Sequence, residues 1–146
     1  MTWKELLEKN QAEAEPTDKA ELDALRKVVD RSLADAHLKG ISSDGRFGHA
    51  YDAVRALSTM AIRACGYRIK SIGGAHYNTF IALKAVDPKL GQISSYLNTC
   101  RRKRNDLMYE EANVVSNNEA EELLLRATTF KVEVESWVKK NFPQLA

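Results

Sequence analysis

The stretch RFGHAYDAVRALSTMAIRACG, residues 46–66, decides the fold class, because its apolar side chains recur with helical spacing. One helical face is formed by Tyr51, Val54, Leu57, Ser58, Ala61, Ala64 and Cys65. Alanine recurs throughout the stretch, and small side chains allow another helix to approach closely. Gly66 is a typical helix stop. The stretch therefore predicts a helix over about 46–65 that packs tightly against a neighbouring helix.

Capping signals and apolar periodicity predict further helices on both sides of this stretch. We expect helices over about 2–14, 18–40, 76–86, 88–111 and 116–141. Residues 41–45 are predicted to form a loop, and residues 67–74 a flexible basic loop. Two local signals compete with these assignments. Gly91 weakens the helix that Pro88 begins, and the alternation over 131–135 resembles a strand, although helical periodicity covers more positions.

Short connections between helices favour neighbours that pack antiparallel. The predicted fold is therefore all-α, an up-and-down bundle of about five to six helices. A length of 146 residues suits a single domain, 1–146. The apolar stripe fades early in the first predicted helix, so we expect residues 1–15 to form a peripheral N-terminal helix.

Composition indicates an ordinary globular protein, with 44% hydrophobic and 29% charged residues. The first residues lack the features of a signal peptide, and no apolar run is long enough to cross a bilayer. We therefore expect a cytoplasmic protein with no membrane association. Cys65 and Cys100 lie in apolar helical patterns, which favours reduced thiols. The spacing of histidines and cysteines predicts no metal site, and no motif predicts a cofactor.

The net charge of +2 is unevenly distributed along the chain. Residues 1–46 carry a net charge of −2 and residues 106–146 a net charge of −4. Residues 47–105 carry ten basic side chains against Asp52 and Asp87, a net charge of +8. A cationic segment favours a polyanionic partner such as nucleic acid. The alternative is a solvated basic face that the acidic flanks neutralise after folding.

Arg104 occupies an apolar position of its predicted helix, one turn after Cys100 and one turn before Met108. Burying an unpaired guanidinium costs several kcal/mol. Arg104 should therefore have a partner, or face a cleft or a subunit interface. Asp52 is the candidate partner, because acidic side chains are rare in this part of the chain. A buried pair that only fixes the helix register would satisfy the same pattern.

Arg101, Asn105 and Tyr109 are spaced four residues apart and share one strip of the same helix. A guanidinium, an amide and a phenol together suit the binding of a phosphate and of a ribose or base. An ordinary polar face beside a core tyrosine has the same spacing.

The segment from about His49 to Glu111 resembles the HEPN domains, small helical bundles found in prokaryotic toxin–antitoxin and defence systems. The resemblance rests on three stretches in order: 50–53 (AYDA), 66–68 (GYR) with a glycine-containing loop to His76, and 101–110 (RRKRNDLMYE). The family's motif is an arginine, usually followed by a polar residue such as asparagine, then four to six residues and then a histidine. Arg104 and Asn105 match its first half, and Tyr109 stands where the histidine is expected.

The resemblance implies metal-independent cleavage of RNA by a symmetric homodimer whose motifs meet at a cleft. Arg104 would bind the scissile phosphate, Asn105 would position it, and Asp52 would orient Arg104. Tyr109 would complete the catalytic set, although a phenol with a pKa near 10 is a poor base at neutral pH. His76 would supply the missing imidazole, or merely cap or pack at a helix start.

Six residues complete the expected RNA interface: Arg101, Arg102, Lys103, Arg68, Lys70 and His76. The leading hypothesis is an RNA-directed HEPN-type protein, either a ribonuclease toxin or a degenerate relative. A second hypothesis is a non-catalytic helical module that binds a nucleotide or a protein, such as a nucleotidyltransferase antitoxin. A third is a structural dimer in which Arg104 and Asp52 only form an ion pair.

Overall fold

The computed structural model describes residues 1–109 and 114–146, apart from the side chains of Met108 and Tyr109. These residues form six α-helices and a two-stranded sheet, so the predicted all-α fold of five to six helices is confirmed. The helices and strands are, in chain order, α1 (Trp3–Glu8), β1 (Ala12–Ala14), α2 (Lys19–Ala36), α3 (Ser43–Ala64), β2 (Tyr67–Ile69), α4 (Ala75–Val86), the 3₁₀ helix η1 (Leu90–Ile93), α5 (Ser94–Tyr109), α6 (Asn117–Asn141) and the 3₁₀ helix η2 (Pro143–Leu145).

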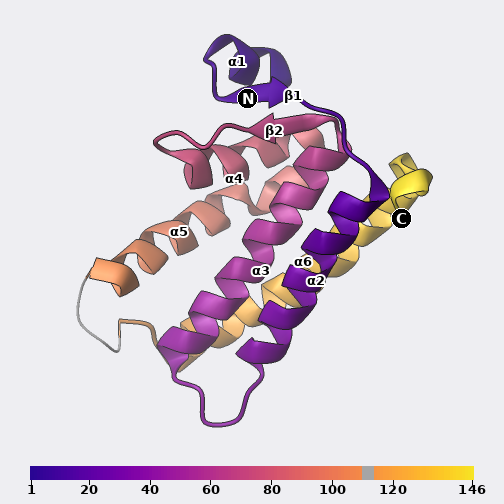
Figure 1. The fold of residues 1–146 in the computed structure, drawn as a ribbon. Coiled ribbons are helices and arrows are strands. Elements are labelled where there is room, and N and C mark those ends of the chain that lie inside the picture. The colour runs from indigo at the N-terminus through magenta and orange to yellow at the C-terminus, as the bar shows by residue number, and fades with distance from the viewer. Residues whose placement is uncertain (110–113) are drawn as a thin grey trace.

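Helix α3 is the centre of the bundle and packs mainly against α2 and α6, while α4 and α5 contact it less extensively (Figure 1). Its alanines Ala50, Ala53 and Ala61 are fully buried, as close helix packing requires. The largest buried side chains of the core include Tyr51, Phe80 and Phe130. The main hydrophobic core therefore surrounds the helix that the opening stretch of sequence predicted.

Helix α3 begins at Ser43, so the loop prediction for residues 43–45 was wrong. Ser42 is the N-cap, and its hydroxyl accepts a hydrogen bond from the backbone N–H of Gly45. The capping signals that predicted helices from residues 2, 18 and 116 are confirmed. Thr2, Asp18 and Ser116 each accept the hydrogen bond of a backbone N–H three residues later. Residues 131–135 belong to α6, so the helical periodicity outweighed the local strand pattern.

The helix predicted over 2–14 was wrong beyond its first turns. Helix α1 ends at Glu8, and Asn10 adopts a left-handed conformation with φ of 57° that reverses the chain. Residues Ala12–Ala14 then form β1, which pairs antiparallel with β2. The prediction of a flexible loop over 67–74 was therefore also wrong for Tyr67–Ile69. Trp3 stacks on Tyr67 with ring centroids 4.2 Å apart, which holds this N-terminal arm (residues 1–15) on the bundle.

The helix predicted over 88–111 is divided into η1 and α5. Gly91 marks the division because α4 passes directly over it. A Cβ atom at position 91 would lie 2.7 Å from Cα of Lys84. The missing side chain thus allows two backbones to touch.

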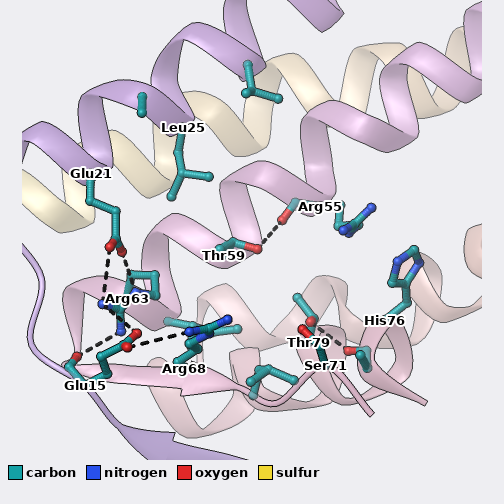
Figure 2. A pocket seen from close by; sticks show the side chains of 15 residues that line it. Glu15, Glu21, Leu25, Arg55, Thr59, Arg63, Arg68, Ser71, His76 and Thr79 are labelled. Atoms are coloured by element: carbon teal, nitrogen blue, oxygen red, sulfur yellow. Dashed lines mark hydrogen bonds and ion pairs between the residues drawn. The ribbon is translucent and has the colours of Figure 1, made fainter. Parts of the chain in front are cut away.

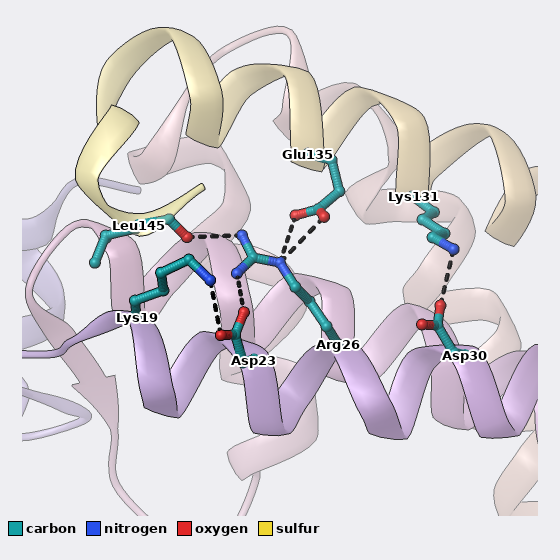
Figure 3. A network of polar contacts seen from close by, with 7 residues as sticks. All are labelled: Lys19, Asp23, Arg26, Asp30, Lys131, Glu135 and Leu145. Atoms are coloured by element: carbon teal, nitrogen blue, oxygen red, sulfur yellow. Dashed lines mark hydrogen bonds and ion pairs between the residues drawn. The ribbon is translucent and has the colours of Figure 1, made fainter.

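Polar contacts hold α2 to the C-terminal part of the chain (Figure 3). The guanidinium of Arg26 binds Asp23 and Glu135 and donates to the carbonyl of Leu145. Lys131 of α6 donates to Asp30 of α2 at 2.8 Å. Among the described residues, no helix is long and apolar enough to cross a membrane.

Candidate functional site

Three helices bring a histidine, a tyrosine and arginines together. Tyr51 on α3 is fully buried, and its hydroxyl lies 3.1 Å from Nδ1 of His76 on α4. Cζ of Arg104 on α5 lies 5.6 Å from the centroid of the same tyrosine ring, a cation–π geometry. The tyrosine that the sequence assigned to a core face therefore also supports two polar side chains.

Two further arginines belong to this site. Arg101 and Arg55 act electrostatically, together with Arg104, on both Tyr51 and His76. Cζ of Arg101 lies 5.5 Å from the ring centroid of the exposed Tyr77, and its Nε donates to Oδ1 of Asn98. We call Arg55, Arg101, Arg104, Tyr51 and His76 the arginine cluster.

The hydrogen bond between Tyr51 and His76 has a preferred direction. Burial raises the pKa of Tyr51 to about 12, so the phenol keeps its proton at neutral pH. Among the described residues, the imidazole is the hydrogen-bond partner of this buried hydroxyl. A buried donor without an acceptor is costly, so the hydroxyl donates to Nδ1. His76 then carries its proton on Nε2, and Nε2–H is a donor.

Burial also lowers the pKa of His76 from its ordinary value of 6.5, and the charges of Arg55, Arg104 and Arg101 lower it further. The imidazole is therefore neutral at pH 7. The cluster thus combines three permanent positive charges with a neutral N–H donor. Such a set of donors suits an anion with several oxygens, and a phosphate is the common biological example.

Arg104 and Asp52 contact each other, as the sequence predicted. Nη2 of Arg104 lies 4.0 Å from Oδ1 of Asp52, the outer limit of an ion pair. The side chains are 28% and 43% exposed. Exposed pairs of this kind contribute at most about 1 kcal/mol. Arg104 is thus half-buried, and a buried pair that fixes the helix register is not what the structure contains.

The other predicted residues of α5 lie apart from the cluster or on its edge. Lys103 forms an ion pair with Glu119 of α6 at 3.4 Å, which directs it to a different neighbour. Arg102 and Asn105 are exposed. Tyr109 ends α5, and its side chain lies outside the described residues. The predicted strip of Arg101, Asn105 and Tyr109 therefore contributes Arg101 to the described site.

The predicted residues of β2 and its flank differ in their surroundings. The ammonium of Lys70 donates to Oδ1 of Asn10 in the N-terminal arm. Arg68 is half exposed, and its Nη1 lies 3.6 Å from Oε1 of Glu15. Arg68 lines a groove of about 480 Å³ that also reaches His76 and Arg55. Arg68 and two members of the cluster thus line the same groove, which we call the α2–α3 groove (Figure 2).

Sequence reasoning missed two arginines of α3. Arg55 could have been found, because it lies one helical turn after Asp52 and therefore on the same side of the helix. Arg63 gave no such signal. Its side chain is buried, with 6% exposed, and its guanidinium binds the carboxylates of Glu21 and Glu15 and donates to the carbonyls of Glu15, Pro16 and Tyr67. Arg63 joins α3 to the start of α2 and to β2, at the far end of the α2–α3 groove.

The two cysteines take no part in the cluster. Both are free thiols, as predicted, and burial raises the pKa of each to about 11. Within residues 1–109 and 114–146, no three His, Cys, Asp or Glu side chains are grouped so that they could hold a metal ion.

Comparison with models of protein families, with curated proteins and with solved structures gives no match to this chain. The functional assignment therefore depends on the arginine cluster, the α2–α3 groove and the distribution of charge.

Proposed function

We propose that this chain is an RNA-directed protein of the HEPN type whose arginine cluster binds a backbone phosphate. The observation that carries the proposal is the convergence of Arg55, Arg101 and Arg104 on the Tyr51–His76 pair. Asp52 is the one carboxylate that contacts an arginine of this cluster among the described residues. The site therefore keeps a surplus of positive charge that an RNA phosphate would neutralise.

The proposal has a binding component and a catalytic component. Binding follows from the guanidinium groups and from Nε2–H of His76, all of which donate hydrogen bonds to phosphate oxygens. The resemblance to HEPN domains adds cleavage without a metal ion. The ribose 2′-hydroxyl would lose its proton to water and attack the neighbouring phosphorus. The bond from phosphorus to the 5′-oxygen would break and that oxygen would take a proton from water, which leaves a 2′,3′-cyclic phosphate and a 5′-hydroxyl. Arg104 would stabilise the charge that develops on the phosphate, and Asp52 would orient Arg104. A homodimer would place two such clusters on either side of one RNA strand.

The geometry supports binding more directly than cleavage. A neutral imidazole that donates from Nε2 is a ligand for phosphate, and it does not accept the proton of a 2′-hydroxyl through that nitrogen. Cleavage would need another acceptor for this proton. Binding and cleavage must therefore be measured separately.

Arg104→Ala tests the proposal, and Arg126→Ala is the matched control. Cζ of Arg126 lies 4.3 Å from the ring centroid of Tyr96, and its Nε lies 3.5 Å from Oε1 of Glu122. Arg126 therefore resembles Arg104 in its contacts, but it lies on α6 outside the cluster. Affinity for a labelled single-stranded RNA should fall at least tenfold for Arg104→Ala and change less than twofold for Arg126→Ala. Cleavage of total RNA in the presence of EDTA, compared for the same two variants, tests the catalytic component.

Three results would contradict the proposal or part of it. Equal RNA affinity of the two variants would exclude the cluster as the binding site. Tight RNA binding without cleavage would leave a non-catalytic binding protein. A complex with a protein partner that is insensitive to salt and forms without RNA would favour the protein-binding module instead.

A further inference from the structure

The α2–α3 groove continues from the arginine cluster toward the ion pairs of Arg63. Figure 2 shows Arg55 and His76 at one end of the groove and Arg63 at the other. A volume of about 480 Å³ is within the range of roughly 300–1,000 Å³ that small-molecule sites occupy. Arg55 and Arg63 are eight residues apart on α3, which corresponds to roughly 12 Å along the helix. The groove is therefore about as long as one nucleotide.

The end of the groove at Arg55 favours an anion. Arg55 is exposed, and no carboxylate forms an ion pair with it among the described residues. At the opposite end, Arg63 and Arg68 are already paired with Glu15 and Glu21. The uncompensated charge is thus confined to the end that adjoins the cluster.

The middle of the groove favours a ligand group that donates hydrogen bonds. Thr59 and Thr79 line it, and each hydroxyl already donates to a backbone carbonyl of its own helix, at 3.0 Å and 2.8 Å. A hydroxyl that has used its one hydrogen still accepts through its oxygen. A ligand that passes these residues should therefore bring O–H or N–H groups, as a ribose does.

The walls of the groove favour a flat, weakly polar group beyond the ribose. Aliphatic side chains from both helices and from β2 line it, namely Leu25, Val28, Ile62 and Ile69. Contact of a nucleobase with such side chains removes apolar surface from water. Along α3 the groove therefore offers a cation at Arg55, a hydroxyl acceptor at Thr59 and an apolar wall at Ile62.

We propose that the α2–α3 groove binds one nucleotide, with its phosphate at Arg55, its ribose at Thr59 and Thr79, and its base on the aliphatic walls. This inference rests on the proposed function, because the phosphate end of the groove is shared with the arginine cluster. It adds that the protein contacts the nucleoside beside the bound phosphate as well as the phosphate itself.

Isothermal titration with adenosine 5′-monophosphate, adenosine and inorganic phosphate tests the groove directly. The monophosphate should bind at least tenfold more tightly than either fragment. Arg55→Ala should remove most of this advantage over adenosine. Equal affinity for phosphate and the monophosphate would overturn the proposal, because it would leave an anion site without a nucleoside subsite.

Blocking the groove provides the second test. Thr59→Phe should abolish binding of the monophosphate, and Thr128→Phe is the control, because Thr128 makes the same bond to a carbonyl four residues earlier on α6. Ser71→Trp at an exposed position of the groove is a second blocking variant if Thr59→Phe does not fold. Unchanged binding in a folded blocking variant would overturn the proposal.

The two proposals can fail separately. If Arg104→Ala weakens RNA binding while the blocking variants do not change binding of the monophosphate, RNA binding at the cluster is supported and nucleotide binding in the groove is excluded. If the blocking variants abolish monophosphate binding while Arg104→Ala leaves RNA binding intact, the groove binds nucleotides and the RNA proposal fails.

Discussion

The hydroxyl of Tyr51 donates to Nδ1 of His76 across 3.1 Å, and this hydrogen bond places the proton of the neutral imidazole on Nε2. Tyr51→Phe removes this bond but keeps the ring under Arg104. We expect a loss of about 1 kcal/mol of fold stability and a several-fold loss of RNA affinity, because Nε2–H is no longer enforced. The ¹⁵N shifts of His76 should show the Nε2–H tautomer in the wild type and a mixture in the variant. A wild-type Nδ1–H tautomer would contradict the assigned direction.

Binding of RNA should strengthen as the pH falls below 6.5. The pKa of His76 is lowered in the free protein, so the imidazole is neutral at pH 7 and gains a charge only in acid. A protonated His76 adds a positive charge beside three arginines and attracts phosphate. Because protonation is disfavoured in the folded protein, the same change lowers fold stability between 6.5 and the depressed pKa.

His76→Gln is the control for this pH dependence. Glutamine keeps an N–H donor near the position of Nε2 and does not titrate. Affinity measured from pH 7.5 to 5.5 should rise in the wild type and stay level in the variant. Parallel curves would show that another group is responsible.

Arg104→Ala should separate function from stability. The contact with Asp52 at 4.0 Å is partly exposed to solvent, so its loss should cost less than about 1 kcal/mol by urea unfolding. The slope of log affinity against log salt for single-stranded RNA should decrease by about 0.7, the value for one lost phosphate contact. A large loss of stability with an unchanged slope would support the structural role that the sequence left open.

In contrast to Arg104→Ala, Arg63→Met should strongly lower the free energy of unfolding. The guanidinium is buried among two carboxylates and three carbonyls, so its removal leaves several polar groups unpaired and should cost about 3–5 kcal/mol. Lys131→Ala is the comparison, because its ion pair with Asp30 is exposed and should contribute less than about 1 kcal/mol. Similar unfolding free energies for the two variants would contradict the central position of Arg63.

Gly91→Ala should destabilise the fold by roughly 1–3 kcal/mol, because the new Cβ atom would overlap the backbone of Lys84. Gly48→Ala is the matched control within α3. Apart from its chain neighbours and the adjacent backbone of α3, no atom of the described residues lies within 4 Å of a Cβ atom at position 48, so alanine should be neutral or stabilising by up to about 1 kcal/mol. Thermal denaturation of both variants checks the difference in sign.

The helices were predictable because their signals are local. Asp18 and Ser116 cap helices at the predicted positions, and periodicity located α3 and α4 closely. The N-terminal arm was not predictable in this way. Strand β1 forms by pairing with β2. Because β2 lies more than fifty residues away in the sequence, no local pattern indicates that pairing.

The candidate site was predictable in part. The phase of α5 predicted that Arg104 needs a partner, and the shortage of acidic side chains predicted Asp52. The hydrogen bond between Tyr51 and His76 and the approach of Arg101 to Tyr77 depend on how α3, α4 and α5 pack. Packing of this kind is a property of the tertiary structure, so spacing along the chain does not reveal it.

The pairing of Ala12 with Ile69 also has a kinetic consequence. Helices α2 and α3 are neighbours in sequence and meet early in folding, whereas the arm must wait until β2 exists. Terminal segments with few buried contacts open at a lower free energy than a packed core. Glu15 belongs to this arm and forms one end of the α2–α3 groove, while the arginine cluster is built without it. Opening of the arm would therefore remove Glu15 from the groove and leave the contacts within the arginine cluster in place.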